Sequence, residues 1–139
     1  MTKELLSAME LVRLYATQYY KPSYEEDAHI QGQPIWSNHL RNGKQVFWPY
    51  HWLIREDGTA ERLLEDHETG WHAGKWEVNC RSVAITLYGD FDSNIPSDVQ
   101  LASIARIISS NYSQVAHENI IGHCEVNPKK SCPGVWFMN

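Results

Sequence analysis

This chain of 139 residues has no long apolar run and no excess of positive charge. None of its apolar stretches approaches the roughly 20 residues that a membrane-spanning helix requires. The N-terminus lacks the basic and then apolar segments of a secretion signal. Because the net charge is -5, a nucleic-acid partner, which attracts basic surfaces, is not expected either.

Cysteine is scarce as well, with three residues and no Cys-x-x-Cys pair. An odd number of cysteines does not suit a disulfide framework, and a structural zinc site usually takes four Cys or His ligands in paired spacings. These absences favour a protein made in a reducing compartment, so we expect a cytoplasmic location.

The composition that remains is that of an ordinary globular protein, with 42% hydrophobic and 21% charged residues. The length suits one core, so we expect a single domain over residues 1–139. Apolar side chains recur at helical spacing over residues 3–20, which predicts an amphipathic helix within residues 1–20. Residues 21–45 contain prolines, glycines and polar side chains, and they predict a long loop.

Three strands are expected after this loop, and the first two form a hairpin. Residues 46–55 are rich in aromatic and branched side chains, which predicts a strand. Asp57-Gly58 is a turn signal, so residues 59–64 should return as the hairpin partner. Residues 83–88 form a short apolar run that is typical of a buried strand.

A helix is predicted over residues 98–112, because Ser97 and Gln100 have the spacing of a capping box. One face of this helix is predicted to be lined by Val99, Leu101, Ile104, Ala105, Ile108 and Tyr112. Residues 119–121 are expected to form a last short strand. Alternating strands and helices around one sheet predict an α/β fold.

The stretch that carries most chemical information runs from His123 to Cys132. A histidine and a cysteine nine positions apart, followed by Pro133-Gly134, could converge on one metal ion. Neutral imidazole and thiolate are ligands that Zn²⁺ prefers, and a catalytic zinc site has three protein ligands and one open position. The sequence therefore predicts that His123 and Cys132 bind zinc.

Further motifs occur in order along the chain and resemble those of the zinc-dependent N-acetylmuramoyl-L-alanine amidases, which include amidase-type phage lysozymes and peptidoglycan recognition proteins. They are Tyr50-His51, Asp57-Gly58-Thr59, Trp71-His72-Ala73-Gly74, Ser82-Val83-Ala84-Ile85, Pro96-Ser97-Asp98-Val99-Gln100, Gly122-His123 and Lys130-Ser131-Cys132-Pro133-Gly134. The resemblance covers about residues 46–137. It implies a central mixed β-sheet flanked by helices, a zinc cofactor and peptidoglycan as the substrate.

The resemblance also implies two catalytic residues. In the phage lysozyme branch, a tyrosine before the motif histidine and a lysine two residues before the ligand cysteine assist hydrolysis, and these positions are Tyr50 and Lys130. Lys129 could share the task of Lys130, because the loop is one residue longer here. Another branch uses a glutamate as the general base, but Thr86 occupies that position and excludes this mechanism.

Substrate contacts are expected from His51, Trp71 and His72, because the resemblance places these motifs at the groove. The residues themselves leave alternatives open. His51 suits a packing or supporting position at least as well, and His72 could equally be structural.

One family feature is not found. The first zinc ligand of the family is a histidine at the end of a strand before the first helix, and this chain enters the helix directly. His29 or His39 on the long loop could replace it, the natural start could lie upstream, or the metal could have been lost. An unpaired edge strand left by this difference would favour a homodimer.

Two functions follow from the resemblance. The first is a zinc-dependent amidase that cuts between N-acetylmuramic acid and L-alanine, in a cytoplasm or as a phage endolysin released to the cell wall. The second is a non-catalytic module that binds muropeptide with a degenerate metal site. Cys132 favours the enzyme, because its loss often marks the non-catalytic members.

Overall fold

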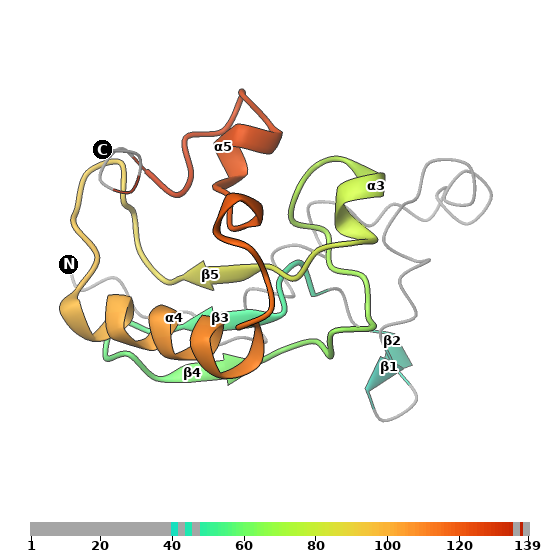
Figure 1. The fold of residues 1–139 in the computed structure, drawn as a ribbon, viewed down its shortest axis with the longest axis horizontal. Helices are drawn as coiled ribbons and strands as arrows, with labels where there is room; N and C mark the ends of the chain where they lie inside the picture. Colours follow the sequence, from blue (N-terminus) through green and yellow to red (C-terminus); the bar gives the residue numbers. More distant parts are fainter. Residues whose placement is uncertain (1–39, 42–43, 46–47, 135–136, 138–139) are drawn as a thin grey trace.

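The computed structural model describes residues 40–41, 44–45, 48–134 and 137. The helix predicted within residues 1–20 lies outside these residues, and so do most of the predicted loop and both alternative ligands, His29 and His39. The described part forms a small α/β domain with a mixed three-stranded sheet (Figure 1).

The sheet has the strand order β4-β3-β5. Its central strand β3 (Trp52–Ile54) pairs with β4 (Ala60–Arg62) in antiparallel and with β5 (Ile85–Leu87) in parallel orientation. All three strands fall inside the ranges predicted from the sequence, and each is shorter than predicted. The hairpin between β3 and β4 turns at Gly58, whose φ of 82° lies in the left-handed region that glycine adopts without strain.

A second, two-stranded sheet interrupts the end of the predicted loop. Strand β1 (Leu40–Arg41) pairs with β2 (Lys44–Gln45) in antiparallel orientation. The intervening sequence Asn42-Gly43 is a strong signal for a tight hairpin turn. This signal lies within the segment that was predicted as a loop from its polar composition.

Helix α4 (Asp98–Asn111) begins with the predicted capping box. The backbone N–H of Gln100 donates to Ser97 Oγ at 3.3 Å, and the backbone N–H of Ser97 donates to Gln100 Oε1 at 3.1 Å. These two bonds satisfy amides that have no partner inside the helix. Figure 1 shows α4 lying along the sheet in front of β3 and β4.

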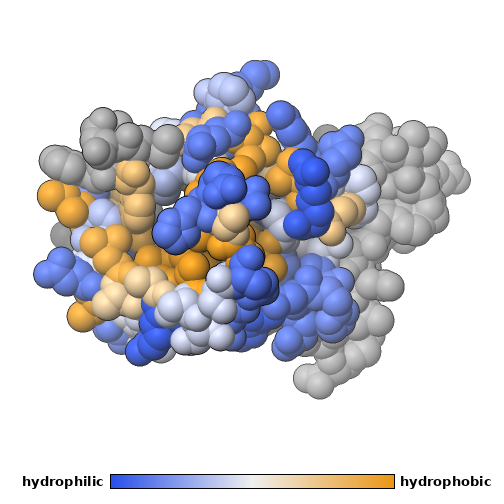
Figure 2. Space-filling model, viewed as in Figure 1, coloured by the Kyte–Doolittle hydropathy of each residue, from blue (hydrophilic) through white to orange (hydrophobic). Residues whose placement is uncertain are grey.

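The buried face of α4 differs from the predicted apolar face. Gln100, Ser103 and Ile107 are buried, whereas Val99 is 50% and Leu101 38% exposed. Apolar atoms are therefore visible on the side of the molecule that carries α4 (Figure 2). The reason is hydrogen bonding, because Gln100 Nε2 donates to the Tyr88 carbonyl at 2.9 Å and Ser103 Oγ to the Gly58 carbonyl at 2.6 Å.

Three short helices complete the described part: α3 (Trp76–Asn79), the 3₁₀-helix η2 (His117–Asn119) and α5 (His123–Val126). The strand expected over residues 119–121 is wrong, because the N–H of Ile120 bonds back to the His117 carbonyl at 3.0 Å and closes a turn. Both α3 and α5 lie beyond the β5 edge of the sheet (Figure 1).

The centre of the described part is small and well enclosed. Leu53, Ile54 and Leu64 are at most 2% exposed, and Trp48 packs with Leu64 at one end. His51 is the one fully buried polar side chain of comparable size in this part of the chain. No helix among the described residues is long and apolar enough to cross a membrane.

Candidate metal centre and surrounding groups

The structure brings His123 and Cys132 together. His123 is the first residue of α5, and its Nδ1 lies 3.7 Å from Cys132 Sγ. The loop between them is closed by a hydrogen bond from the Cys124 N–H to the Cys132 carbonyl at 2.8 Å. Gly122 permits this closure, because a Cβ at that position would lie 2.6 Å from Pro133 Cδ.

His123 is held in a state that can bind a metal. Burial lowers the pKa of its imidazole, the positive charge of Lys130 lowers it further, and the Ala73 carbonyl acts in the opposite direction. The neutral imidazole is therefore favoured, and this is the form that ligates zinc. Its Nε2 is buried, and no partner within hydrogen-bond geometry lies among the described residues.

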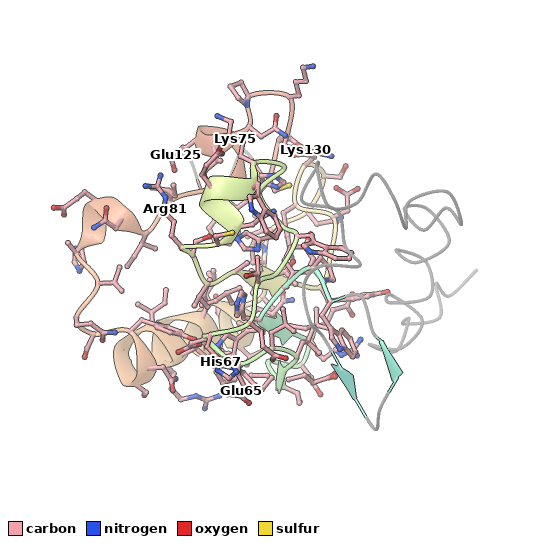
Figure 3. All side chains as sticks on the ribbon, turned by 90° about the vertical axis from the view of Figure 1, so that its right-hand side faces the viewer. Glu65, His67, Lys75, Arg81, Glu125 and Lys130 are labelled. Carbon is pink, nitrogen blue, oxygen red and sulfur yellow. The ribbon has the colours of Figure 1, made fainter. Side chains whose placement is uncertain are left out.

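Lys130 lies near this pair, because its charge acts on His123. Its backbone N–H donates to the Asn127 carbonyl at 2.9 Å, which places the lysine in the turn just before Cys132. Lys129 is exposed in the same turn. Figure 3 shows Lys130 at the same end of the molecule as Lys75 and Glu125, which come from the beginning of α3 and from α5.

Tyr50 is half-buried and lies two residues before β3, with His51 between them. The neighbouring Pro49 and His51 are buried, so the phenol is attached to a segment that is anchored in the protein. Trp71 is also half-buried, in the turn that leads to His72.

His51 connects three segments and does not reach the surface. Its exposure is 0%, its Nε2–H donates to the Glu68 carbonyl at 2.9 Å, and its Nδ1 accepts from the Ala84 N–H at 3.1 Å. Burial lowers the pKa of this imidazole, which keeps it neutral. The expected direct contact between His51 and a substrate is not supported, because the ring is enclosed and both nitrogens are used.

His72 is engaged in a similar way. Its Nδ1 lies 3.2 Å from the Pro49 carbonyl and its Nε2 lies 2.8 Å from Ser82 Oγ. Burial lowers the pKa of His72 to about 4, and the rings of His51 and His72 pack edge to face with centroids 5.9 Å apart. This geometry favours the structural interpretation of His72 over a polar contact with a substrate.

One supporting residue could not be found from the sequence. Asn79 is 7% exposed and its Oδ1 accepts from the Ala73 N–H at 2.9 Å, which holds the turn containing His72. No sequence pattern distinguishes this asparagine from a surface one. Of the other two cysteines, Cys80 is exposed and Cys124 is half-buried.

A complete metal site is not present among the residues that the structure describes, since no group of three His, Cys, Asp or Glu side chains could hold an ion there. The pair His123 and Cys132 fits zinc in its ligand chemistry. A third ligand would have to come from outside the described ranges, where His29 and His39 lie.

A family model and two solved structures are similar to this chain. A family model described as N-acetylmuramoyl-L-alanine amidase matches residues 12–135. Among solved structures, the fold is similar to the N-acetylmuramoyl-L-alanine amidase LysC from Clostridium intestinale URNW, with 24% identity, a TM-score of 0.50 and 81% of this chain covered. It is equally similar to the endolysin amidase LysCS from that organism, with 24% identity, a TM-score of 0.50 and 83% covered.

The chain spans 65% and 66% of the lengths of these two proteins, which is slightly less than two thirds. A search of curated proteins gave no match.

Proposed function

Because this chain belongs to the N-acetylmuramoyl-L-alanine amidase family, we propose that it hydrolyses the amide bond between N-acetylmuramic acid and L-alanine in peptidoglycan. The observation that carries this proposal is the approach of His123 Nδ1 to Cys132 Sγ at 3.7 Å, in a chain whose motifs follow the order of the family. The name of LysCS as an endolysin supports a cell-wall site of action.

His123 and Cys132 would hold the zinc ion. Their support is chemical, since Nδ1 of a neutral imidazole lies 3.7 Å from a thiol. When bound, zinc polarises the scissile carbonyl and lowers the pKa of the attacking water toward ~7.

Tyr50 and Lys130 would stabilise the charge that develops during hydrolysis. The phenol of Tyr50 donates a hydrogen bond to the carbonyl oxygen as it becomes negative, and the ammonium group of Lys130 stabilises the same anion. The effect of Lys130 on the pKa of His123 supports its nearness to the reacting groups. Thr86, at the centre of β5, cannot replace a glutamate as general base, which leaves the phenol and the ammonium group.

Trp71 would contribute an apolar surface to the groove, while His51 and His72 support the site from beneath it. This division follows from the hydrogen bonds of the two histidines, which use both nitrogens of each ring. A homodimer remains a prediction from the unpaired edge expected for the sheet.

A second candidate function has one observation in its favour. Only two of the three required ligands lie among the described residues, which suits a module that binds muropeptide without cutting it. A direct measurement separates the two functions.

The test is the zinc content of the purified, dialysed full chain by elemental mass spectrometry, together with the release of L-alanine-bearing peptide from a muropeptide. We expect about one zinc per chain, because His123, Cys132 and one further ligand would complete a catalytic site. We also expect hydrolysis of the muropeptide. Cys132→Ala and His123→Ala should lose both properties. Cys80→Ala is the matched control, because this thiol is exposed and lies outside the candidate centre.

Retention of hydrolysis by Cys132→Ala would contradict the zinc assignment. Muropeptide binding without zinc or hydrolysis in the unmodified chain would instead establish the binding module.

A further inference from the structure

Two cysteine residues meet where the loop after α5 returns to the start of that helix. Cys124 is the second residue of α5, so its backbone N–H has no carbonyl partner inside the helix. The Cys132 carbonyl accepts a hydrogen bond from this N–H at 2.8 Å. The bond closes the loop of residues 125–131, and both cysteines are in the thiol form.

This hydrogen bond limits the distance between the two residues. With the Cys124 nitrogen 2.8 Å from the Cys132 oxygen, the lengths of the backbone bonds keep the two Cα atoms within about 6.7 Å of each other. A disulfide spans Cα separations of about 4.4–6.8 Å. The two backbones therefore already have a spacing that a disulfide can bridge.

The two sulfur atoms lie in the same region. A Cβ built on Gly122 would lie 3.5 Å from Cys124 Sγ and 2.6 Å from Cδ of Pro133, the residue after Cys132. Cys132 Sγ lies 3.7 Å from Nδ1 of His123, the residue before Cys124. Each sulfur is thus near the chain neighbour of the other cysteine, and rotation about the two Cα–Cβ bonds is the movement that joins them.

An oxidant can reach the pair from solvent, and zinc competes with it. Cys132 is exposed and Cys124 is half-buried, so a small oxidant meets Cys132 first. Zinc binds cysteine as the thiolate. Because a sulfur in a disulfide is no longer a thiolate, ligation of zinc by Cys132 and a disulfide at Cys132 exclude each other.

We propose that Cys124 and Cys132 form a reversible disulfide when the chain lacks zinc and meets a low-molecular-weight disulfide such as oxidised glutathione. The bond withdraws Cys132 from the metal and so switches the site off. This consequence rests on the proposed function, in which Cys132 ligates zinc, whereas the formation of the bond does not depend on it.

The oxidation proceeds in two exchange steps. The Cys132 thiolate attacks one sulfur of oxidised glutathione, forms a mixed disulfide and releases one glutathione thiolate. The Cys124 thiolate then attacks the Cys132 sulfur, forms the bond between the two cysteines and releases the second glutathione thiolate. Two protein thiols are oxidised, one glutathione disulfide is reduced, and the released thiolates take up the two protons that the cysteines lose.

Peptide mapping tests the pairing directly. Trypsin places the three cysteines on separate peptides, which cover residues 76–81, 107–129 and 131–139. The full chain is freed of metal with a chelator, incubated with oxidised glutathione, alkylated and digested for mass spectrometry. We expect the peptides 107–129 and 131–139 to be joined, while the peptide of Cys80 stays separate.

Two variants are the controls for this pairing. Cys80→Ala should form the same bond, because Cys80 takes no part in it. Cys124→Ser should bind zinc like the unmodified chain, but after oxidation without metal its Cys132 should carry glutathione. In the unmodified chain, glutathione on Cys132 without a bond to Cys124, or a bond from either cysteine to Cys80, would overturn the proposal.

Zinc content measures the consequence of the bond. The disulfide-linked chain should bind at least about tenfold less zinc than the reduced chain, and dithiothreitol should restore binding. The zinc-loaded chain should resist the same oxidation, because its Cys132 is ligated. Equal zinc content in the reduced and the disulfide-linked chain would refute the switch.

Failure of the amidase function would be seen separately, since none of these measurements requires hydrolysis. A chain that forms the bond and loses zinc on oxidation, but cuts no muropeptide when reduced, would uphold the switch and refute the amidase. A chain that cuts muropeptide but forms no bond would refute only the switch. A reduced chain that binds no zinc would overturn the switch together with the zinc assignment.

Discussion

Acidification should destabilise this protein, and His72 should account for a measurable share of the loss. Burial lowers the pKa of His72 in the folded state from 6.5 to about 4. As the pH falls below 6.5, the unfolded chain binds a proton at this residue while the folded chain does not. The free energy of unfolding must therefore decrease as the pH falls, and the full contribution is lost once the pH reaches about 4.

The magnitude follows from the shift. The difference between 6.5 and about 4 is about 2.5 pKa units, and one unit corresponds to about 1.4 kcal/mol, so the complete loss is about 3 kcal/mol. Because the titration is gradual, about 2 kcal/mol of this should be lost between pH 7 and pH 5. Burial lowers the pKa values of His51 and His123 as well, and these residues act in the same direction.

The assay is urea unfolding of the metal-free chain at pH 7, 6 and 5, followed by tryptophan fluorescence. Metal must be removed with a chelator, because zinc binding is itself pH-dependent. His72→Asn is the control, since asparagine does not titrate. Its free energy of unfolding should fall by about 2 kcal/mol less than that of the unmodified chain between pH 7 and pH 5. Parallel curves for the two proteins would refute the reasoning.

Two further predictions concern Tyr50 and Gln100. Tyr50→Phe should lower kcat by roughly 10²-fold with little change in KM, because it removes one donor to the oxyanion. An equal loss of binding and turnover in muropeptide assays would mean that Tyr50 only shapes the groove. Gln100→Ala should reduce the free energy of unfolding in urea by about 1–3 kcal/mol, because the Tyr88 carbonyl and the Ser97 N–H lose their partner. The exposed Ser110→Ala on the same helix is its control and should change stability by about 0.5 kcal/mol or less.

The sequence alone determined the parts of this protein that depend on neighbouring residues. The Asp57-Gly58 turn predicted the hairpin of β3 and β4, and the Ser97 and Gln100 spacing predicted the start of α4. The ordered motifs identified the family, and the spacing of His123 and Cys132 predicted two side chains that the structure places 3.7 Å apart. Turn conformations, helix caps and short loops are set by interactions over a few residues, so their signals are present in the local sequence.

Only the tertiary structure decided which side chains became buried supports. The burial of Gln100 and Ser103 in place of Val99 and Leu101 depends on carbonyls at Tyr88 and Gly58, which are 12 and 45 residues distant along the chain. The same applies to the histidines that hold the segment around Tyr50, whose partners lie 17 to 33 residues away for His51. A hydrogen bond between remote segments leaves no periodicity in the sequence, because its geometry exists only after the chain has folded.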